Sequence, residues 1–173
     1  MTGRTKPGAY LLLARVSNLP TIWTNVIAGA ALTGAPMTVA TLLPVAVGMS
    51  CFYTAGMWMN DACDAEADAA ARADRPIPSG DVTRREVWTG TAVLTGAGAV
   101  AVALARPPLL TWLWVVLLAA AITYYNVRHK RDRFGPLAMG LCRGLVYLVA
   151  GAAVAGAAGT AVRTGATVMV LYV

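Results

Sequence analysis

The sequence predicts an all-α protein built as a bundle of membrane-spanning helices. Of its 173 residues, 58% are hydrophobic and 13% are charged, about half the roughly 25% that is usual in soluble domains, and the mean hydropathy is +0.62. No charged residue occurs between Arg15 and Asp61, a length sufficient for two helices of about 20 residues across a bilayer. The basic residues lie in short segments between apolar runs, which argues against nucleic-acid binding.

Five apolar runs are separated by turn signals or by charged residues. Gly34-Ala35-Pro36 divides the first two runs, Pro107-Pro108 divides the third from the fourth, and Gly135-Pro136 begins the fifth. The fifth run is rich in glycine and alanine, as closely packed membrane helices are. The second run reaches residue 60 or beyond. The predicted spans cover residues 9–33, 37–60, 86–106, 109–127 and 135–161.

The last ten residues, 164–173, are uncharged but too few to cross a bilayer. We interpret them as the beginning of a sixth helix. The predicted fold class is therefore all-α, a polytopic transmembrane helical bundle with five spans plus the start of a sixth. Residues 1–173 are expected to form a single domain that is incomplete at its C-terminus.

The distribution of lysine and arginine predicts how the bundle is oriented. The N-terminal tail and the loops after the second and fourth spans hold ten basic residues against two on the opposite side, with Arg15 and Arg143 set aside as residues within spans. Because basic loops stay on the cytoplasmic side, the loop after the second span and the loop of residues 124–134 are expected to meet at the cytoplasmic face of the inner or plasma membrane. Arginine outnumbers lysine twelve to two, which favours a GC-rich bacterial genome.

Six of the eight acidic residues lie between positions 61 and 81. On a helix, Asp61, Asp64 and Asp68 are spaced i, i+3 and i+7, and Asn60 lies one turn before Asp64, so four oxygen-bearing side chains share one face. Like charges at this spacing repel by roughly 0.2–0.5 kcal/mol per pair, which indicates a cation among them. Oxygen ligands suit Mg²⁺ better than zinc. The alternative is a solvated acidic helix end without a ligand.

The acidic stretch and the loop that follows it resemble the first aspartate-rich motif of the UbiA superfamily of intramembrane prenyltransferases. The resemblance also covers residues 15–25 and 124–144, and the last ten of these are similar to an EboC-like branch of the superfamily. The motifs are Asn60-Asp61-x-x-Asp64-x-x-x-Asp68, Arg72-x-x-Arg75-Pro76-x-Pro78-Ser79-Gly80 and Gly135-Pro136-x-x-Met139-Gly140-x-Cys142-Arg143-Gly144.

The resemblance implies a fold of about nine helices with a second aspartate-rich motif on a later cytoplasmic loop. Asp132 is the only acidic residue after Glu86, so we interpret the chain as an N-terminal portion of such a protein. Whether this portion is active without the second motif stays open.

The resemblance also implies roles for individual residues. The metal set is Asn60, Asp61, Asp64 and Asp68. The residues expected to act in catalysis are Asp64, Asp68, Tyr125 and Lys130. The residues expected to bind diphosphate are Arg15, Asn25, Arg72, Arg75, Lys130 and Arg143.

Several of these residues also have structural interpretations. Arg75 could serve membrane topology alone, Tyr125 could be an interfacial anchor, and Asn25 could bond to a neighbouring helix. Arg15 and Arg143 lie within spans, where a charge costs roughly 2.5–3.5 kcal/mol, so they face a polar cavity or reach the interface. The spacing from Tyr125 to Lys130 is one residue longer than the Tyr-x-x-x-Lys of most of the family and fits the EboC-like branch better.

The function predicted is that of a membrane prenyltransferase. It would use Mg²⁺ to ionise an isoprenyl diphosphate and would transfer the prenyl group to an electron-rich acceptor, such as an aromatic ring. The alternative is a non-catalytic membrane binder or carrier of metal or polyprenyl lipid. The expected partners are a prenyl diphosphate, a small-molecule acceptor and the lipid bilayer, with no nucleic acid.

Overall fold

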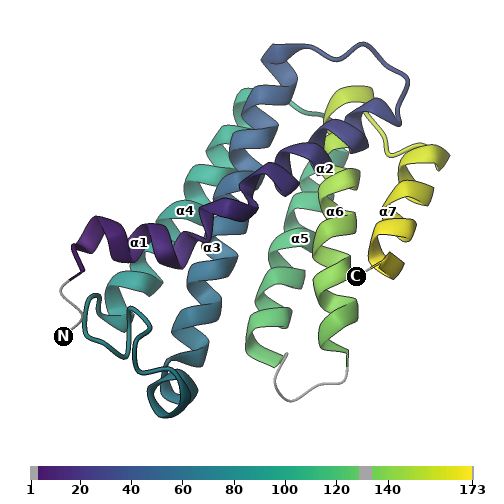
Figure 1. The fold of residues 1–173 in the computed structure, drawn as a ribbon. Coiled ribbons are helices and arrows are strands. Elements are labelled where there is room, and N and C mark those ends of the chain that lie inside the picture. Colours follow the sequence, from purple (N-terminus) through teal and green to yellow (C-terminus); the bar gives the residue numbers. More distant parts are fainter. Residues whose placement is uncertain (1–3, 129–133, 173) are drawn as a thin grey trace.

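The structure is a computed structural model that describes residues 4–128 and 134–172. Within these ranges all regular structure is helical, as predicted (Figure 1). The elements in chain order are α1 (Lys6–Ala14), the 3₁₀-helix η1 (Val16–Asn18), α2 (Leu19–Ala31), α3 (Val39–Ala71), α4 (Arg84–Leu104), α5 (Leu109–Arg128), α6 (Gly135–Ala155) and α7 (Thr160–Tyr172).

The helices pack as two groups joined by α2. In one group α3 runs beside α4, and in the other α6 lies between α5 and α7 (Figure 1). α2 crosses the bundle obliquely and contacts both α3 and α6. The central apolar core lies where these groups meet, around Val26, Phe52, Leu118 and Val149.

Four helices, α3, α4, α5 and α6, are long and apolar enough to cross a membrane. Three of the predicted spans agree closely with α3, α4 and α5, although α3 continues past Asn60 to Ala71. The fifth predicted span ends earlier than expected, because Gly156 adopts a left-handed conformation (φ +81°) and its N–H donates to the carbonyl of Ala152. Glycine takes this conformation without steric penalty, so it ends α6 at Ala155.

The first predicted span is not one continuous helix. Arg15 adopts a left-handed backbone conformation (φ +46°, ψ +49°) that ends α1, and Pro20 lies in the first turn of α2. α2 has 13 residues, fewer than the roughly 20 that a bilayer requires. The predicted count of five spans plus the start of a sixth is therefore not established, although α7 does form a helix where a sixth was expected to begin.

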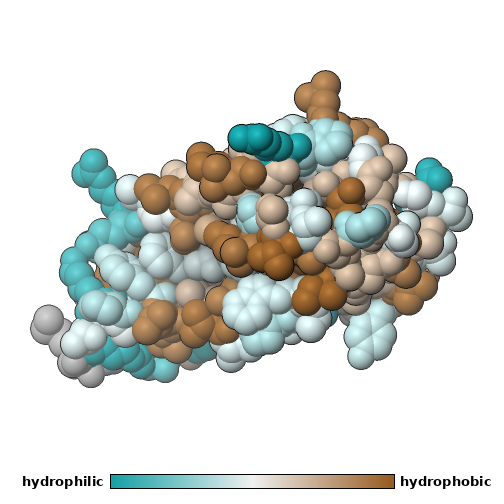
Figure 2. Space-filling model, turned by 90° about the horizontal axis from the view of Figure 1, so that it is seen from above, coloured by the Kyte–Doolittle hydropathy of each residue, from teal (hydrophilic) through white to brown (hydrophobic). Residues whose placement is uncertain are grey.

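The surface of the bundle is largely apolar. Large apolar side chains are exposed on all four candidate spans, among them Val39, Leu104, Leu109 and Leu137. Figure 2 shows a face on which apolar residues predominate and hydrophilic residues gather mainly at one end. Such a surface suits the hydrocarbon region of a bilayer.

Two positions show how closely the helices approach. A Cβ atom added at Gly29 of α2 would lie 2.7 Å from Cα of Tyr147 on α6. A Cβ atom added at Gly48 of α3 would lie 2.9 Å from the carbonyl oxygen of Gly98 on α4. Both distances are far shorter than a normal carbon contact, so these helix pairs require glycine.

The C-terminal ends of α3 and α5 lie at the same end of the bundle (Figure 1). The sequence predicted that the loops following these two helices meet at one surface, and the helix ends are placed accordingly. Residues 129–133 of the second loop lie outside the described residues. Which side of the membrane this end faces stays a prediction.

Candidate active site

The last three turns of α3 bury four oxygen-bearing side chains. The exposed fractions of Asn60, Asp61, Asp64 and Asp68 are 8%, 5%, 8% and 2%. Their spacing along the helix places them on one face, as the sequence predicted. A solvated acidic helix end would leave these groups in water, so their burial argues against that alternative, since a buried carboxylate requires a charged or hydrogen-bonding partner.

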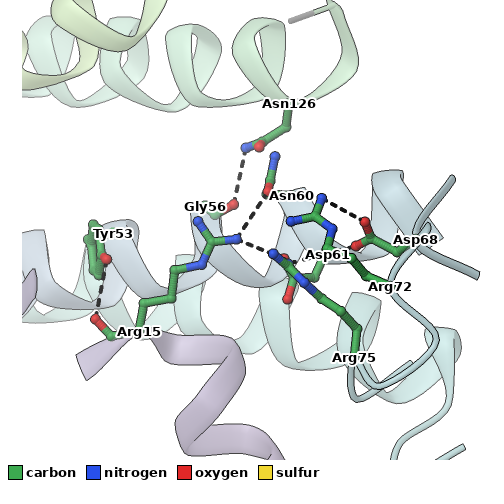
Figure 3. A network of polar contacts seen from close by, with 9 residues as sticks. All are labelled: Arg15, Tyr53, Gly56, Asn60, Asp61, Asp68, Arg72, Arg75 and Asn126. Atoms are coloured by element: carbon green, nitrogen blue, oxygen red, sulfur yellow. Dashed lines mark hydrogen bonds and ion pairs between the residues drawn. The ribbon is translucent and has the colours of Figure 1, made fainter. Parts of the chain in front are cut away.

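Two of the carboxylates are paired with arginines that approach from three directions (Figure 3). Asp61 Oδ1 lies 2.8 Å from Nη1 of Arg75 and 3.1 Å from Nη2 of Arg15. Asp68 lies 2.8 Å from Nη2 of Arg72 and 3.7 Å from Nη1 of Arg75. Asp64 is a third buried carboxylate on the same face, so three guanidinium groups stand against three carboxylates at this end of α3.

The backbone around Arg15 directs its side chain toward α3. Its left-handed conformation lies between α1 and η1, and its carbonyl accepts a hydrogen bond of 3.4 Å from the hydroxyl of Tyr53. The guanidinium donates to Asn60 Oδ1 at 3.4 Å as well as to Asp61. For any residue other than glycine this conformation costs about 1–2 kcal/mol. The contacts of Arg15 therefore hold a locally unfavourable turn in place.

The loop after α3 folds back so that its arginines reach the helix they follow. The backbone N–H of Arg75 donates to the carbonyl of Arg72, and the N–H of Val82 donates to the carbonyl of Pro76. Pro76 and Val82 are buried. The compact loop therefore holds Arg75 against Asp61 instead of leaving it in solvent.

The oxygen donors of α3 do not converge on one point in this structure. Among the described residues, no group of three or more His, Cys, Asp or Glu side chains is placed to hold a metal ion. Arg75 contacts Asp61 and Asp68 at once, so arginine occupies the position between them. The donors are of the type that Mg²⁺ prefers, and the metal set remains a prediction.

A cavity of about 300 Å³ lies beside this network, between α2, α3, α5 and α6. It has a polar part and an apolar part. The polar part includes Arg15, Asn60, Tyr125, Asn126 and Arg143. The apolar part consists mostly of the bundle core and includes Ile22, Met49, Phe52, Leu118 and Val146.

The predicted diphosphate-binding and catalytic residues are divided between the cavity and its edge. Arg15 and Arg143 line the cavity with Tyr125, and among the described residues no carboxylate pairs with Arg143. Asn25 is buried on α2, and in the described part of the chain its Nδ2 has no hydrogen-bond partner and it does not line the cavity. Lys130 lies outside the described residues.

Asn126 of α5 was not singled out from the sequence. It is 3% exposed, lines the cavity, and donates from Nδ2 to the carbonyls of Gly56 on α3 and Ile122 on α5. Its Oδ1 is buried and receives no hydrogen bond from any described residue, a state that costs about 1–3 kcal/mol. An amide within an apolar span next to Tyr125 was a signal available in the sequence.

The family follows from a match over most of the sequence. The pattern of the UbiA prenyltransferase family matches residues 18–173. The chain belongs to this family. The motif residues from Asn60 to Asp68 and the arginines of the following loop lie within the matched region.

Curated relatives are digeranylgeranylglyceryl phosphate synthases. The protein from Ignicoccus hospitalis is 31% identical over 172 residues, which cover 99% of this chain and 55% of the relative. The protein from Methanopyrus kandleri is 45% identical over 78 residues, which cover 44% of this chain and 28% of the relative. The chain spans about half the length of the first of these relatives, and neither comparison supports a bacterial source or bears on the EboC-like branch.

Solved structures have the same fold. A structure from work on digeranylgeranylglyceryl phosphate synthase in membranes aligns with a TM-score of 0.80 at 24% identity, covering 96% of this chain and 57% of that one. The apo structure of a UbiA homologue from Aeropyrum pernix aligns with a TM-score of 0.68 at 26% identity, covering 87% of this chain and 57% of that one. The arrangement of α1 to α7 is therefore that of a UbiA-type bundle.

Proposed function

We propose that this chain binds a prenyl diphosphate in the cavity and transfers its prenyl group to a nucleophilic acceptor. The observation that carries the proposal is the two-part lining of the cavity. Arg15 and Arg143 lie in its polar part, and the apolar part is continuous with the core. A prenyl diphosphate has the same two parts, a charged head and an apolar tail.

The arginines are proposed to bind the diphosphate. Arg143 lines the cavity with no carboxylate partner among the described residues, so its charge is available to a phosphate oxygen. Arg15 and Arg75 are engaged with Asp61. Because a guanidinium binds phosphate oxygens in a two-point fork, we propose that the incoming diphosphate draws these side chains away from the carboxylate.

The carboxylates that the arginines leave are proposed to hold Mg²⁺. Asp61, Asp64 and Asp68 are buried on one helix face with the amide oxygen of Asn60, which supplies the oxygen donors that a hard cation needs. When bound, Mg²⁺ would stabilise the negative charge of the departing diphosphate as a Lewis acid. The arginines would neutralise the charge that remains, and exclusion of water by the apolar walls would strengthen each of these contacts.

Tyr125 is proposed to lie near the reacting carbon, because it lines the cavity on α5, across from Asn60 on α3. The acceptor is a second small molecule. The name of the curated relatives contains a glyceryl phosphate, so we propose as acceptor either a hydroxyl compound of that kind or an electron-rich aromatic ring. The reaction is proposed to take place at the cytoplasmic face, since the ten basic residues of the predicted loops gather on that side.

The proposal is tested with Asp64→Asn in the full protein, assayed in membranes with a labelled prenyl diphosphate. We expect turnover to fall by roughly 10²-fold or more, because a carboxylate ligand of the proposed Mg²⁺ is lost, and with it part of the stabilisation of the departing diphosphate. Glu66→Gln is the matched control: it removes one carboxylate from the same helix, but Glu66 is exposed and pairs only with Arg84 among the described residues. Its turnover should stay at the wild-type value.

The alternative function, a non-catalytic carrier, gives a different result. A carrier would bind Mg²⁺ and a non-hydrolysable prenyl diphosphate but would form no prenylated product with excess acceptor. Undiminished turnover in Asp64→Asn would refute the proposed role of the acidic face, and binding without product in the wild type would support the carrier.

A further inference from the structure

Asn126 has a fixed orientation. Its Nδ2 donates to the Gly56 carbonyl at 3.2 Å and to the Ile122 carbonyl at 2.9 Å, so both amide hydrogens are used. A flipped amide would set Oδ1 against these two carbonyl oxygens, which is repulsive. The oxygen of the side chain is therefore the atom left without a partner among the described residues.

The oxygen of Asn126 is buried in the cavity wall without a donor. The side chain is 3% exposed, and no donor in the described part of the chain reaches Oδ1. Figure 3 shows Asn126 facing Asn60 and Arg15 across the space between α5 and α3. Less than 1 Å² of Oδ1 is accessible, so a molecule in this part of the cavity reaches this acceptor when the side chains that cover it move aside.

The chemistry of this position selects what the oxygen can bind. A phosphate oxygen carries no hydrogen and would be repelled. A metal ion would take the carboxylates of α3, and among the described residues no carboxylate lines the cavity, so a cation is not expected at Oδ1. An aromatic carbon would offer only a C–H, a weak donor. A hydroxyl group fits, because its hydrogen can be donated while a lone pair remains for reaction.

We propose that Asn126 is a positioning residue that accepts a hydrogen bond from the nucleophilic hydroxyl of the acceptor and so selects hydroxyl-bearing acceptors. This inference rests on the proposed function and chooses between its two acceptor classes. The hydroxyl oxygen forms a bond to the allylic carbon, the bond from that carbon to the diphosphate oxygen breaks, and the diphosphate leaves with the electron pair. The hydroxyl proton passes to a diphosphate oxygen, and Asn126 stays neutral throughout.

The inference is tested by a binding cycle with the full protein in membranes. The probes are an alkyl glyceryl phosphate with one free hydroxyl and its deoxy counterpart, each measured in the presence of a non-hydrolysable prenyl diphosphate. We expect the wild type to bind the hydroxyl probe at least about tenfold more tightly. Asn126→Ala should reduce this preference to about twofold or less, mainly by weakening the hydroxyl probe.

A purely structural role of Asn126 would weaken both probes equally and leave the preference intact, which would overturn the inference. Thr123→Ala is the matched control on α5, since its exposed hydroxyl donates to the Ala119 carbonyl and does not line the cavity. Its preference should equal that of the wild type.

The inference and the proposed function fail in different ways. A wild type that binds the prenyl diphosphate analogue but shows no preference for the hydroxyl probe overturns the role of Asn126 and leaves the proposed function standing. A wild type that does not bind the prenyl diphosphate analogue overturns both.

Discussion

The polar end of α3 and the contact between α2 and α6 hold the bundle together in opposite ways. At the end of α3, separate segments meet through charged side chains, with Arg15 and Arg75 both on Asp61. Between α2 and α6, the backbones themselves touch at Gly29 and Tyr147. The first kind of contact can be exchanged for contacts to a ligand, because a guanidinium can turn to a phosphate. The second kind cannot change without moving a helix.

This difference separates the parts of the molecule that can respond to substrate from those that fix the cavity. The carboxylates of Asp61 and Asp68 are almost fully buried, whereas the side chains of Arg15, Arg72 and Arg75 are 36%, 51% and 25% exposed. Moving one of these arginines out of the network therefore costs less free energy than moving one of the carboxylates would. The glycine contacts keep the walls in place while the charged groups rearrange.

The largest effect is expected when a fixed contact is broken. Gly29→Leu would place side-chain atoms against the backbone of Tyr147, where even a Cβ would lie 2.7 Å from Cα. We expect destabilisation of about 3 kcal/mol, seen as a much lower melting temperature in detergent and little folded protein. The control is Gly96→Ala on α4, where a Cβ meets nothing within 4 Å. It should raise stability by about 0.5–1 kcal/mol, and equal melting temperatures for the two variants would contradict the close packing.

The next prediction concerns activity and compares two substitutions of Arg15. Arg15→Ala and Arg15→Gly both remove the guanidinium from Asp61 and Asn60, so both should lose roughly 10²-fold in turnover of prenyl diphosphate. Glycine adopts the conformation at φ +46° without a steric cost, whereas alanine adopts it at a cost, so Arg15→Gly should be more stable than Arg15→Ala by about 1 kcal/mol. Wild-type turnover in the glycine variant would show that only the turn matters at this position.

The helical spans could be predicted because their sequence signals are local. Pro107-Pro108 and Gly135-Pro136 mark helix boundaries by backbone chemistry alone, and α5 and α6 begin where these signals place them. Gly156 was an equally local signal, and it would have given the correct end of α6. The shared face of Asp61 to Asp68 followed from helical periodicity alone.

The break at Arg15 could not be predicted, because a left-handed arginine is unfavourable in isolation and depends on distant contacts. Its carbonyl meets Tyr53 and its guanidinium meets Asp61, 38 and 46 residues away. The pairing of Arg75 with Asp61 likewise depends on how the loop folds back. Asn126 was missed for a related reason: its importance lies in which of its two polar atoms is left without a partner, and only the fold reveals that.

A moderate effect is expected at the exchangeable contacts themselves. Arg75→Lys keeps the charge, and a single nitrogen, Nη1, makes both contacts to Asp61 and Asp68. An ammonium cannot, however, form the two-point fork that a guanidinium makes with phosphate oxygens. We expect the KM for prenyl diphosphate to rise about tenfold, which corresponds to the loss of one charged hydrogen bond. Arg72→Lys, at a more exposed residue paired with Asp68 alone, should change KM by about twofold. A larger effect at Arg72 than at Arg75 would mean that the network is ordered differently in the bound state.

The smallest effect is expected where polar contacts near the same end serve the fold alone. Thr83 caps α4: its Oγ1 accepts from the N–H of Glu86, and the Glu86 carboxylate accepts from the N–H of Thr83. Thr83→Ala should destabilise the protein by about 1 kcal/mol and leave the KM for prenyl diphosphate unchanged below the melting temperature. Thr89→Ala, on the exposed side of the same helix, should change neither quantity. If Thr83→Ala raised KM as Arg75→Lys does, the loop that carries Arg75 would depend on this cap. The polar contacts at the start of α4 would then help to position Arg75 and would not serve the fold alone.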